Sequence, residues 1–401
     1  MKALIIGGGI AGPAAAMALR RAGIDATVYE ARPSGAEGAG VFLTLGSNGI
    51  DALRAIGADT EVVSAGFPTP EIVVYSGTGK RLGVTRVSGT AGSGPVSHTL
   101  QRAGLYGALR DEARRRGVPF VHGKRLTAAE ETPDEVRALF ADGSEATGDL
   151  LIGCDGIHSA VRRLIDPTAP APAYAGLLGL GGYTRGVPVD VEPGSYHMIF
   201  GKRGFFGYAL APGGDVWWFA NVPRPDEPAR HETEAIGAEE WRARLVRMFA
   251  DDAGPAARLV RASQEILPAG PLHTVPRLPL WHRHRMIVIG DAAHAPSPSS
   301  GQGASLSLED AVELAKCLRD RPGIEEAFSA YEALRRPRVE RIVRQAARIN
   351  NSKAAGPVGR VVRDALMPLV LKLTADGKQL RRTYDHRTDW DAPAPAATPA
   401  R

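Results

Sequence analysis

The chain has few cysteines, since only Cys154 and Cys317 occur among its 401 residues. They stand far apart in apolar stretches, which argues against a disulfide framework and favours a reducing, cytoplasmic location. No run of about twenty uncharged apolar residues occurs, so we expect no membrane span. A cluster of glycines interrupts the apolar N-terminus, which favours a strand, a turn and a helix there over a signal peptide.

Aromatic residues are also scarce, at 6% of the chain. The net charge is +5, but basic residues are not interleaved with aromatic ones on any segment. The densest basic run, at residues 335–363, has a helical pattern, and it favours a solvated helix face over a nucleic-acid surface. We therefore expect neither a nucleic-acid partner nor a metal site.

The first motif that is present is GGGIAG, which places Gly7, Gly9 and Gly12 at G-x-G-x-x-G spacing between a strand and a helix. In such a loop the first glycine makes the turn, the second lets the backbone approach a pyrophosphate, and the third lets helix and strand pack closely. The helix N-terminus offers free N–H groups to phosphates. Glu30 ends the next strand and can accept hydrogen bonds from ribose hydroxyls, which favours NAD or FAD over NADP.

The second motif is GCDGIHSAVRR, at residues 153–163. An apolar strand ends at Asp155 and Gly156, and a helix follows with Ser159 near its start. Taken alone, the pattern favours a plain strand-to-helix turn in which Asp155 caps the helix.

The third motif is GDAAHAPSPSSGQGASLSLEDAVE, at residues 290–313. Asp291 follows a strand and can bind the hydroxyls of a linear sugar alcohol, while the helix that starts beyond Gly303 can stabilise an anion. Taken alone, the residues also allow Asp291 as a turn residue and His294 as a packed core histidine. Asp310 lies within the helix, where we expect a solvent or packing role. With the first motif, this pattern predicts one FAD held at both of its ends.

At these motifs the chain resembles the class A flavin-dependent aromatic hydroxylases, which are built on the p-hydroxybenzoate hydroxylase fold. The resemblance covers about residues 1–331. It extends to a G-A-G-V-x-L-like loop at residues 38–43 and to Arg102, whose family equivalent contacts the flavin side of the cofactor. The other matching positions are Gly7, Gly9 and Gly12; Asp155, Gly156, Ser159 and Arg162; residues 290–303; and Glu309, Asp310 and Ala311.

The resemblance implies FAD, NAD(P)H and O2, with a flavin C4a-hydroperoxide as the oxygen donor and no separate dinucleotide fold for the nicotinamide. The implied reaction is hydroxylation or epoxidation of an aromatic or polycyclic small molecule. The alternatives are an FAD-dependent dehydrogenase or reductase and a non-catalytic protein that binds a polycyclic compound. The expected cofactor-binding residues are Gly7, Gly9, Ala11, Gly12, Glu30, Arg32, Val41, Arg102, Asp155, Asp291, Pro298, Gly301, Gln302, Gly303 and Ala304.

The expected fold class is α/β. It comprises a Rossmann-like FAD-binding domain, an inserted and mostly antiparallel β-sheet substrate domain, and C-terminal helices in a monomer or homodimer. The period changes from helical to alternating at about residues 177–222, which marks the inserted sheet. The expected ranges are 1–72, 100–172 and 276–330 for FAD; 73–99 and 173–275 for the substrate; 331–385 for the helices; and 386–401 for a disordered tail.

No acid–base residue stands out, although a base that deprotonates a phenol would help its hydroxylation. Trp217 and Trp218 are neighbours on one strand, so only one of them can face a ligand. Together with Tyr208 they are the expected substrate contacts. The candidates for the base qualify by residue type alone, and a structural role is favoured for each: His197, Tyr208, His273 and His294.

Overall fold

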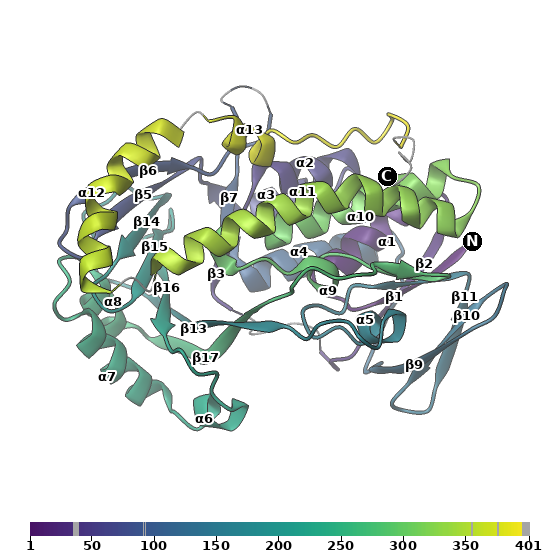
Figure 1. The fold of residues 1–401 in the computed structure, drawn as a ribbon, viewed down its shortest axis with the longest axis horizontal. Helices are drawn as coiled ribbons and strands as arrows, with labels where there is room; N and C mark the ends of the chain where they lie inside the picture. The colour runs from purple at the N-terminus through teal and green to yellow at the C-terminus, as the bar shows by residue number, and fades with distance from the viewer. Residues whose placement is uncertain (35–39, 91, 93, 354–355, 375–376, 395–401) are drawn as a thin grey trace.

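The computed structural model describes the whole chain except residues 35–39, 91, 93, 354–355, 375–376 and 395–401. Two large sheets and a set of long C-terminal helices make up the molecule (Figure 1). The helices, in chain order, are α1 (Ala11–Arg21), α2 (Ser47–Ala55), α3 (Thr60–Ser64), α4 (Arg102–Arg115), α5 (Ala160–Ile165), α6 (Arg230–Glu234), α7 (Ala238–Phe249), α8 (Ala256–Ala262), α9 (Asp291–His294), the 3-10 helix η1 (Pro298–Ser300), α10 (Gly303–Asp320), α11 (Ile324–Lys353), α12 (Pro357–Thr374) and α13 (Lys378–Tyr384).

The first sheet has six strands in the order β18-β19-β12-β1-β2-β8. All neighbours in it are parallel except β18 and β19. The apolar runs of the central strands are buried, as expected for a parallel sheet covered on both faces. The strands are β1 (Lys2–Ile6), β2 (Asp25–Glu30), β8 (Phe120–His122), β12 (Leu150–Gly153), β18 (His282–Arg283) and β19 (Met286–Val288).

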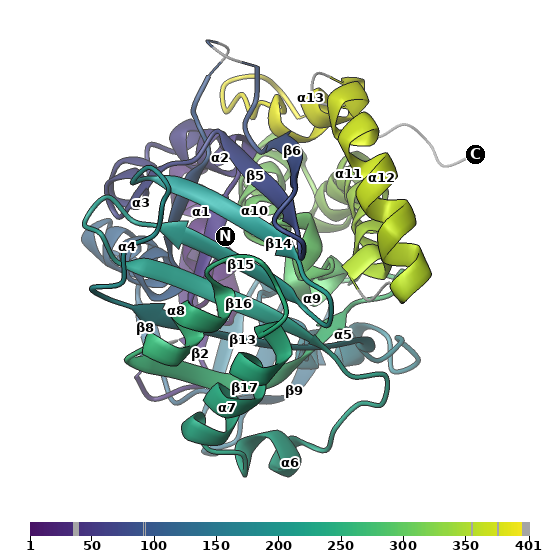
Figure 2. The same ribbon diagram turned by 90° about the vertical axis from the view of Figure 1, so that its left-hand side faces the viewer.

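The second sheet has seven strands in the order β17-β13-β16-β15-β14-β5-β6. Its pairs are antiparallel except β14 with β5. One face packs against α7 and α8, which lie in front of the sheet in Figure 2. The strands are β5 (Glu71–Ser76), β6 (Arg81–Arg86), β13 (Ala173–Thr184), β14 (Ser195–Phe200), β15 (Phe205–Leu210), β16 (Val216–Pro223) and β17 (Glu265–Thr274).

Two small antiparallel sheets complete the strands, in the orders β3-β7-β4 and β11-β10-β9. The expected fold class is confirmed, with a parallel sheet at the N-terminal motif, a mostly antiparallel sheet inserted between its strands, and helices at the C-terminal end. The strands are β3 (Phe42–Leu45), β4 (Gly66–Pro68), β7 (His98–Gln101), β9 (Leu126–Glu131), β10 (Val136–Phe140) and β11 (Glu145–Gly148).

The segment that follows α13 differs from the expected disordered tail over residues 386–394. Trp390 is buried, and the guanidinium groups of Arg21 and Arg319 lie 4.9 and 5.0 Å from its ring centroid. The backbone N–H of Ala394 donates to Asp320 at 2.7 Å. An aromatic anchor with cation–π contacts therefore holds a stretch whose Pro- and Ala-rich composition indicated disorder. The last residues of that stretch, 395–401, lie outside the described residues.

Within the described part of the chain, no helix has both the length and the apolar character that a bilayer-crossing segment requires.

Candidate functional site

The glycine loop between β1 and α1 leaves one open position between two crowded ones. Gly7 has φ +109°, and a Cβ there would lie 2.3 Å from the Cys154 carbonyl oxygen. A Cβ on Gly12 would lie 2.0 Å from the Gly7 carbonyl oxygen. At Gly9 the nearest atom would be a ring carbon of Tyr106, at 3.8 Å. The loop is therefore closed on the protein side at Gly7 and Gly12 and accessible to a ligand at Gly9, as a pyrophosphate site requires.

Glu30 holds the loop from the end of β2. Its carboxylate accepts hydrogen bonds from the backbone N–H of Gly8 at 2.7 Å and from that of Arg32 at 2.8 Å. Glu30, which the sequence predicts to bind a ribose, thus lies directly beside the loop that would hold the phosphates.

The turn that follows β19 brings Asp291 to the start of α10. Gly290 has φ +60°, and a Cβ there would lie 2.7 Å from Ser307 Oγ on α10. Asp291 is half-buried, and a Cβ on Gly303 would lie 3.6 Å from its Oδ1. Burial raises the pKa of Asp291, against the opposing charges of His294 and Arg102. Among the described residues no group donates a hydrogen bond to this carboxylate, so its acceptor capacity is available to a ligand.

The second motif builds a helix start. The carboxylate of Asp155 accepts from Ser159 Oγ at 2.5 Å and from the backbone N–H groups of Ala160 and Val161 at 2.7 and 3.1 Å. These bonds cap α5 and occupy the carboxylate, so the capping role that the pattern alone favours is the one observed. The cofactor contact expected of Asp155 stays a prediction.

Arg162 connects the second motif with the third. Its side chain is buried, and Nη1 donates to the Ala292 carbonyl of α9 at 3.0 Å. Nη2 donates to the Ile157 carbonyl at 2.7 Å. The Ser-x-x-Arg pattern therefore positions the turn that carries Asp291.

The loop before β3 contacts the start of α4 and β13 of the second sheet. The Val41 carbonyl accepts from the backbone N–H of Arg102 at 3.0 Å and from the hydroxyl of Tyr183, on β13, at 3.2 Å. Arg102 Nε donates to the hydroxyl of Tyr106 at 3.0 Å. A Cβ on Gly40 would lie 3.1 Å from the Arg102 side chain, so this loop passes directly over the arginine. Gly38 and its neighbour in the expected loop lie outside the described residues.

Asp310 is the central acceptor of a buried network, and the sequence did not show this. Its Oδ2 accepts from the Gly290 backbone N–H at 3.0 Å and from His294 Nε2 at 2.5 Å, and its Oδ1 accepts from Arg335 Nε at 2.7 Å. Burial would raise the pKa of Asp310, but His294 and Arg335 outweigh burial and hold it below its usual range. The solvent role that was one expectation for Asp310 is thus excluded, and the acid fixes the turn that presents Asp291.

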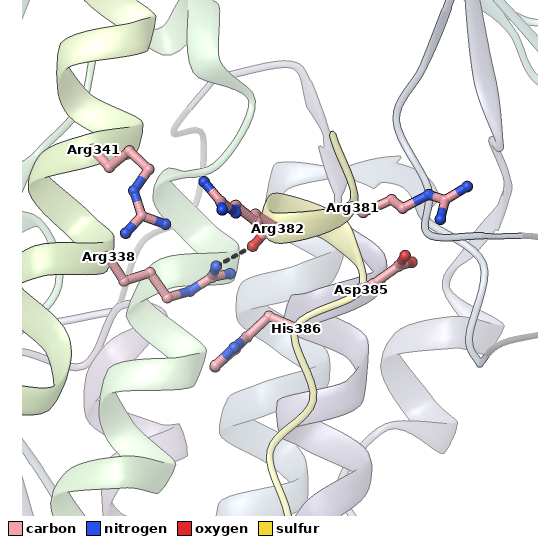
Figure 3. A pocket seen from close by; sticks show the side chains of 6 residues that line it. All are labelled: Arg338, Arg341, Arg381, Arg382, Asp385 and His386. Carbon is pink, nitrogen blue, oxygen red and sulfur yellow. Dashed lines mark hydrogen bonds between the residues drawn. The ribbon is translucent and has the colours of Figure 1, made fainter. Parts of the chain in front are cut away.

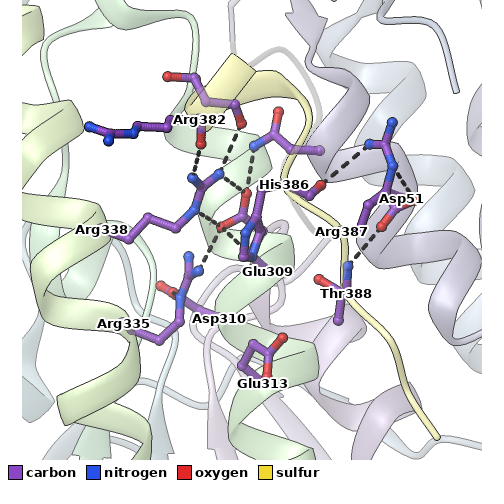
Figure 4. Close-up of polar contacts among 12 residues, drawn as sticks. Asp51, Glu309, Asp310, Glu313, Arg335, Arg338, Arg382, His386, Arg387 and Thr388 are labelled. Carbon is purple, nitrogen blue, oxygen red and sulfur yellow. Dashed lines mark hydrogen bonds and ion pairs between the residues drawn. The ribbon is translucent and has the colours of Figure 1, made fainter. Parts of the chain in front are cut away.

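Glu309 extends the network to the start of α10 (Figure 4). Its carboxylate pairs with Arg335 Nη1 at 2.6 Å and with Arg338 at 2.7 and 2.8 Å. Asn48 Nδ2 donates to Glu309 Oε1 at 2.6 Å and to Gln302 Oε1 at 2.9 Å. The Glu-Asp-Ala motif was visible in the sequence, but its partners on α2 and α11 become visible only in the fold.

Three candidate residues lie on the face of the second sheet that packs on α7 and α8. The rings of His197 and Tyr208 stack at 5.0 Å, and His197 Nε2 lies 2.8 Å from Ser195 Oγ. Burial lowers the pKa of His197 to about 4 and raises that of Tyr208 to about 12. Trp218 lies on the same face and donates from Nε1 to Ser263 Oγ at 2.7 Å. Tyr208 and Trp218 are therefore core residues on the side away from the flavin motifs.

The remaining histidine candidates also have structural partners. His273 Nε2 lies 2.7 Å from a Glu227 carboxylate oxygen, and His294 belongs to the network of Asp310. No group of three or more His, Cys, Asp or Glu side chains that could hold a metal is found among the described residues.

The opposite face of the second sheet carries an aromatic layer that meets the loop of Val41. Trp217 lies 5.6 Å from Phe67 and 6.2 Å from Phe42, between ring centroids. Phe42 in turn lies 5.5 Å from Tyr196 and 5.7 Å from Phe219. Neither Tyr196 nor Phe219 was singled out from the sequence. Alternation places Phe219 on the same face as Trp217, and it places Tyr196 on the face opposite His197.

The other expected cofactor residues lie around the same loops. Gly301 has φ +60° and open space where a Cβ would point. Ala11 opens α1, Arg32 follows β2, Pro298 begins η1, Gln302 is the N-cap of α10, and Ala304 is in its first turn.

Comparisons with known proteins agree with this arrangement. Residues 1–346 match the family model described as an FAD binding domain. The chain is 33% identical over 361 residues to an FAD-dependent urate hydroxylase of Klebsiella pneumoniae, covering 86% of this chain and 88% of that protein. It is 31% identical over 358 residues to the 3-amino-4-hydroxybenzoate 2-monooxygenase of Streptomyces cremeus, covering 86% of each. The structure of Klebsiella pneumoniae HpxO with FAD and uric acid superposes with a TM-score of 0.83 at 28% identity, covering 96% of this chain and 98% of that one.

Proposed function

The chain belongs to the class A FAD-dependent monooxygenases, and on this basis we propose that it transfers one oxygen atom of O2 to an aromatic or polycyclic small molecule, with NAD(P)H as the electron donor. FAD, when bound, takes the electrons from NAD(P)H and activates O2. The observation that carries the substrate class is the aromatic layer of Phe42, Trp217 and Phe219 beside the loop of Val41. Flat aromatic side chains favour a flat, apolar ligand. Relatives named for urate and for an aminohydroxybenzoate support the same class.

We propose that the chain's own groups hold FAD at both ends. The N–H groups after Gly9 and the carboxylate of Glu30 receive the ADP half, because the loop is open there and the acid lies beside it. Asp291 accepts from the ribityl hydroxyls, since its carboxylate has no donor among the described residues. The N-terminus of α10 at Gly303 would lie on the side of the flavin ring and would favour its anionic form. The residues present therefore fit the cofactor.

We propose that positioning, rather than a protein base, is the chain's main contribution to the oxygen transfer. The pKa of His197 is lowered to about 4 by burial, and its ring is stacked on Tyr208 on the far face of the sheet. The described residues that pack in the aromatic layer are apolar or aromatic, and the Tyr183 hydroxyl among them donates to the Val41 carbonyl. Such a surface orients a ring and excludes water without exchanging protons.

The function is tested with a panel of aromatic and polycyclic compounds, assayed for stimulation of NAD(P)H oxidation by the FAD-loaded protein under ¹⁸O2. We expect at least one compound to accelerate the oxidation and to acquire one ¹⁸O atom, measured by mass spectrometry. Product without ¹⁸O would indicate a dehydrogenase or reductase. Saturable binding of a polycyclic compound without turnover would indicate a non-catalytic binding protein.

Replacing Gly303 by Val tests the proposed role of the α10 N-terminus. A Cβ at this position would meet its nearest neighbours, Asp291 and Pro296, at 3.6 and 3.7 Å, which is ordinary van der Waals contact. We therefore expect the chain to fold and to retain FAD through the Gly7–Gly12 loop. The added bulk displaces the flavin ring from the N–H groups, so the flavin potential falls and NAD(P)H oxidation is uncoupled toward hydrogen peroxide. FAD content, potential and peroxide yield are the measurements, and wild-type potential with tight coupling would show that Gly303 serves packing alone.

We also propose a reducing, cytoplasmic location, supported by Cys154 and Cys317, which are both buried and unpaired. Of the two assemblies that the sequence leaves open, we propose the homodimer. The side chains of Leu366, Leu369 and Leu373 on α12 are 54%, 57% and 72% exposed, and apolar patches of this kind are typical of protein contacts.

A further inference from the structure

A basic cleft lies between α11 and α13, on the side of the buried network away from the flavin motifs. It has a volume of about 480 Å³. Figure 3 shows the guanidinium groups of Arg341 and Arg382 directed toward the same space, with Arg338 beneath them. The residues that line the cleft are Arg338, Arg341, Arg381, Arg382, Asp385 and His386.

The positive charge of this cleft is not balanced by the protein. Arg338 is paired with Glu309 and also donates to the carbonyls of Arg382 and Thr383. In contrast, the side chains of Arg341 and Arg382 have no acceptor among the described residues. Like charges that face one another without a counter-ion repel, so an anion between them would be stabilised.

The acidic and imidazole groups at the cleft do not supply that counter-charge. Asp385 is directed away from Arg341 and Arg382, and it accepts from the backbone N–H and hydroxyl of Thr90 at 2.6 and 2.7 Å. His386 lies below, with Nε2 3.9 Å from a Glu309 oxygen. Burial lowers the pKa of His386 to about 4, so the ring is neutral at physiological pH and the charge of the cleft is that of its arginines.

We propose that the cleft between α11 and α13 binds a phosphomonoester dianion through Arg341 and Arg382. Two guanidinium forks match the tetrahedral oxygens of a phosphate and form charge-assisted hydrogen bonds with it. The bound group has two possible sources with the same chemistry, which are the 2′-phosphate of NADPH and a free phosphorylated metabolite. This site is separate from the FAD loop of Gly7–Gly12, and its occupancy does not depend on the proposed oxygen transfer.

The test is calorimetric titration of the FAD-loaded protein with inorganic phosphate and with adenosine 2′,5′-bisphosphate at fixed ionic strength. We expect saturable binding of phosphate with a Kd of roughly 1 mM. The double variant Arg341→Gln/Arg382→Gln should bind at least tenfold more weakly. The matched control is Arg344→Gln, because Arg344 lies on the same helix, is 67% exposed and is paired with Glu340 at 3.4 Å. It should leave the affinity unchanged.

The absence of saturable binding, or equal weakening by Arg344→Gln, would overturn the proposal, since the second result would mean that only the overall charge of the surface acts. Two further measurements decide whether the bound phosphate belongs to NADPH or to a free phosphorylated metabolite. Tighter binding of the bisphosphate, with a KM for NADPH that rises in the double variant while the KM for NADH does not, assigns the site to the electron donor. Equal binding of both probes with an unchanged KM for NADPH assigns it to a free phosphorylated metabolite. The phosphate site itself is tested apart from the proposed function, because the titrations need no turnover, and only the assignment of its source uses KM values.

Discussion

Replacing Asp310 by Ala is expected to lower the free energy of unfolding of the FAD-free protein by about 3–5 kcal/mol, because three buried donors lose their acceptor at about 1–3 kcal/mol each. Arg335 keeps Glu309 as its second partner, so its charge stays paired. Asp310 and Arg335 are almost completely inaccessible to solvent, and the pair is joined by a 2.7 Å hydrogen bond. The substitution also removes the acceptor of the Gly290 N–H and of His294. The turn that presents Asp291 loses its support, so FAD binding should weaken as a consequence.

Urea unfolding followed by circular dichroism measures this effect, with Asp320→Ala as the control. Asp320 lies at the other end of the same helix and pairs with Arg319 nearer the surface, with 21% of its side chain exposed. A surface pair of this kind contributes up to about 1 kcal/mol, and the hydrogen bond from the Ala394 N–H to Asp320 adds about 1 kcal/mol. Similar decreases in the free energy of unfolding of the two variants would show that the burial of Asp310 does not increase its contribution to stability.

The dependence of stability on pH gives a second readout of the same variant. The pKa of Asp310 is lower in the folded protein than in the unfolded chain, because His294 and Arg335 outweigh the effect of burial. Its contribution is therefore fully present above the unfolded pKa, about 4, and is lost as the pH falls through the folded value. The difference in stability between wild type and Asp310→Ala should accordingly shrink as the pH falls below about 4.

Replacing Asp291 by Ala is expected to weaken FAD binding by about 10- to 150-fold, which corresponds to the loss of about 1.5–3 kcal/mol of charge-assisted hydrogen bonding. The expected effect on the FAD-free protein has the opposite sign. Burial raises the pKa of Asp291, so the ionised carboxylate is less favourable in the folded chain than in the unfolded one above about pH 4. Removing it should leave the stability at pH 7 unchanged or raise it. Residues that bind a ligand commonly destabilise the ligand-free protein in this way.

Fluorescence titration with FAD and urea unfolding of the FAD-free protein measure the two effects separately. Asp291→Asn is the matched variant, because the amide retains a carbonyl acceptor for one hydroxyl and should restore part of the affinity. Wild-type FAD affinity in Asp291→Ala, combined with a loss of stability like that of Asp310→Ala, would reverse the roles that we assign to the two acids.

Asp291 and Asp310 have different roles in the segment of residues 290–313: one is available to a ligand, and the other holds the turn in place. The carboxylate of Asp310 accepts hydrogen bonds from Gly290, His294 and Arg335, all within the protein. Asp291 has a carboxylate without a donor among the described residues, directed toward the space before Gly303. We therefore expect Asp310 to affect FAD binding indirectly, because the position of Asp291 depends on it.

The sequence by itself determined the features that depend on local geometry. A backbone turn, a close approach of helix to strand and a free helix N-terminus are properties of a few consecutive residues, so Gly7, Gly12 and the start of α10 could be assigned from their spacing alone. The capping role of Asp155 was predictable for the same reason, since its donors lie within six residues. Sequence alternation likewise showed that Trp217 and Trp218 point to opposite faces.

Only the tertiary structure decided which of those faces is covered and which charges meet. Alternation shows that neighbouring residues of a strand lie on opposite faces, but it does not show what covers each face. The packing of α7 and α8 on one face was needed to assign Trp218 to the core and Trp217 to the aromatic layer. The pairing of Asp310 with Arg335 joins residues on two helices, and neither helix shows its partner in its own pattern. Trp390 is anchored by arginines from distant segments. Burial and charge pairing depend on which segments are brought together in space, and this is settled by the packing of the whole chain.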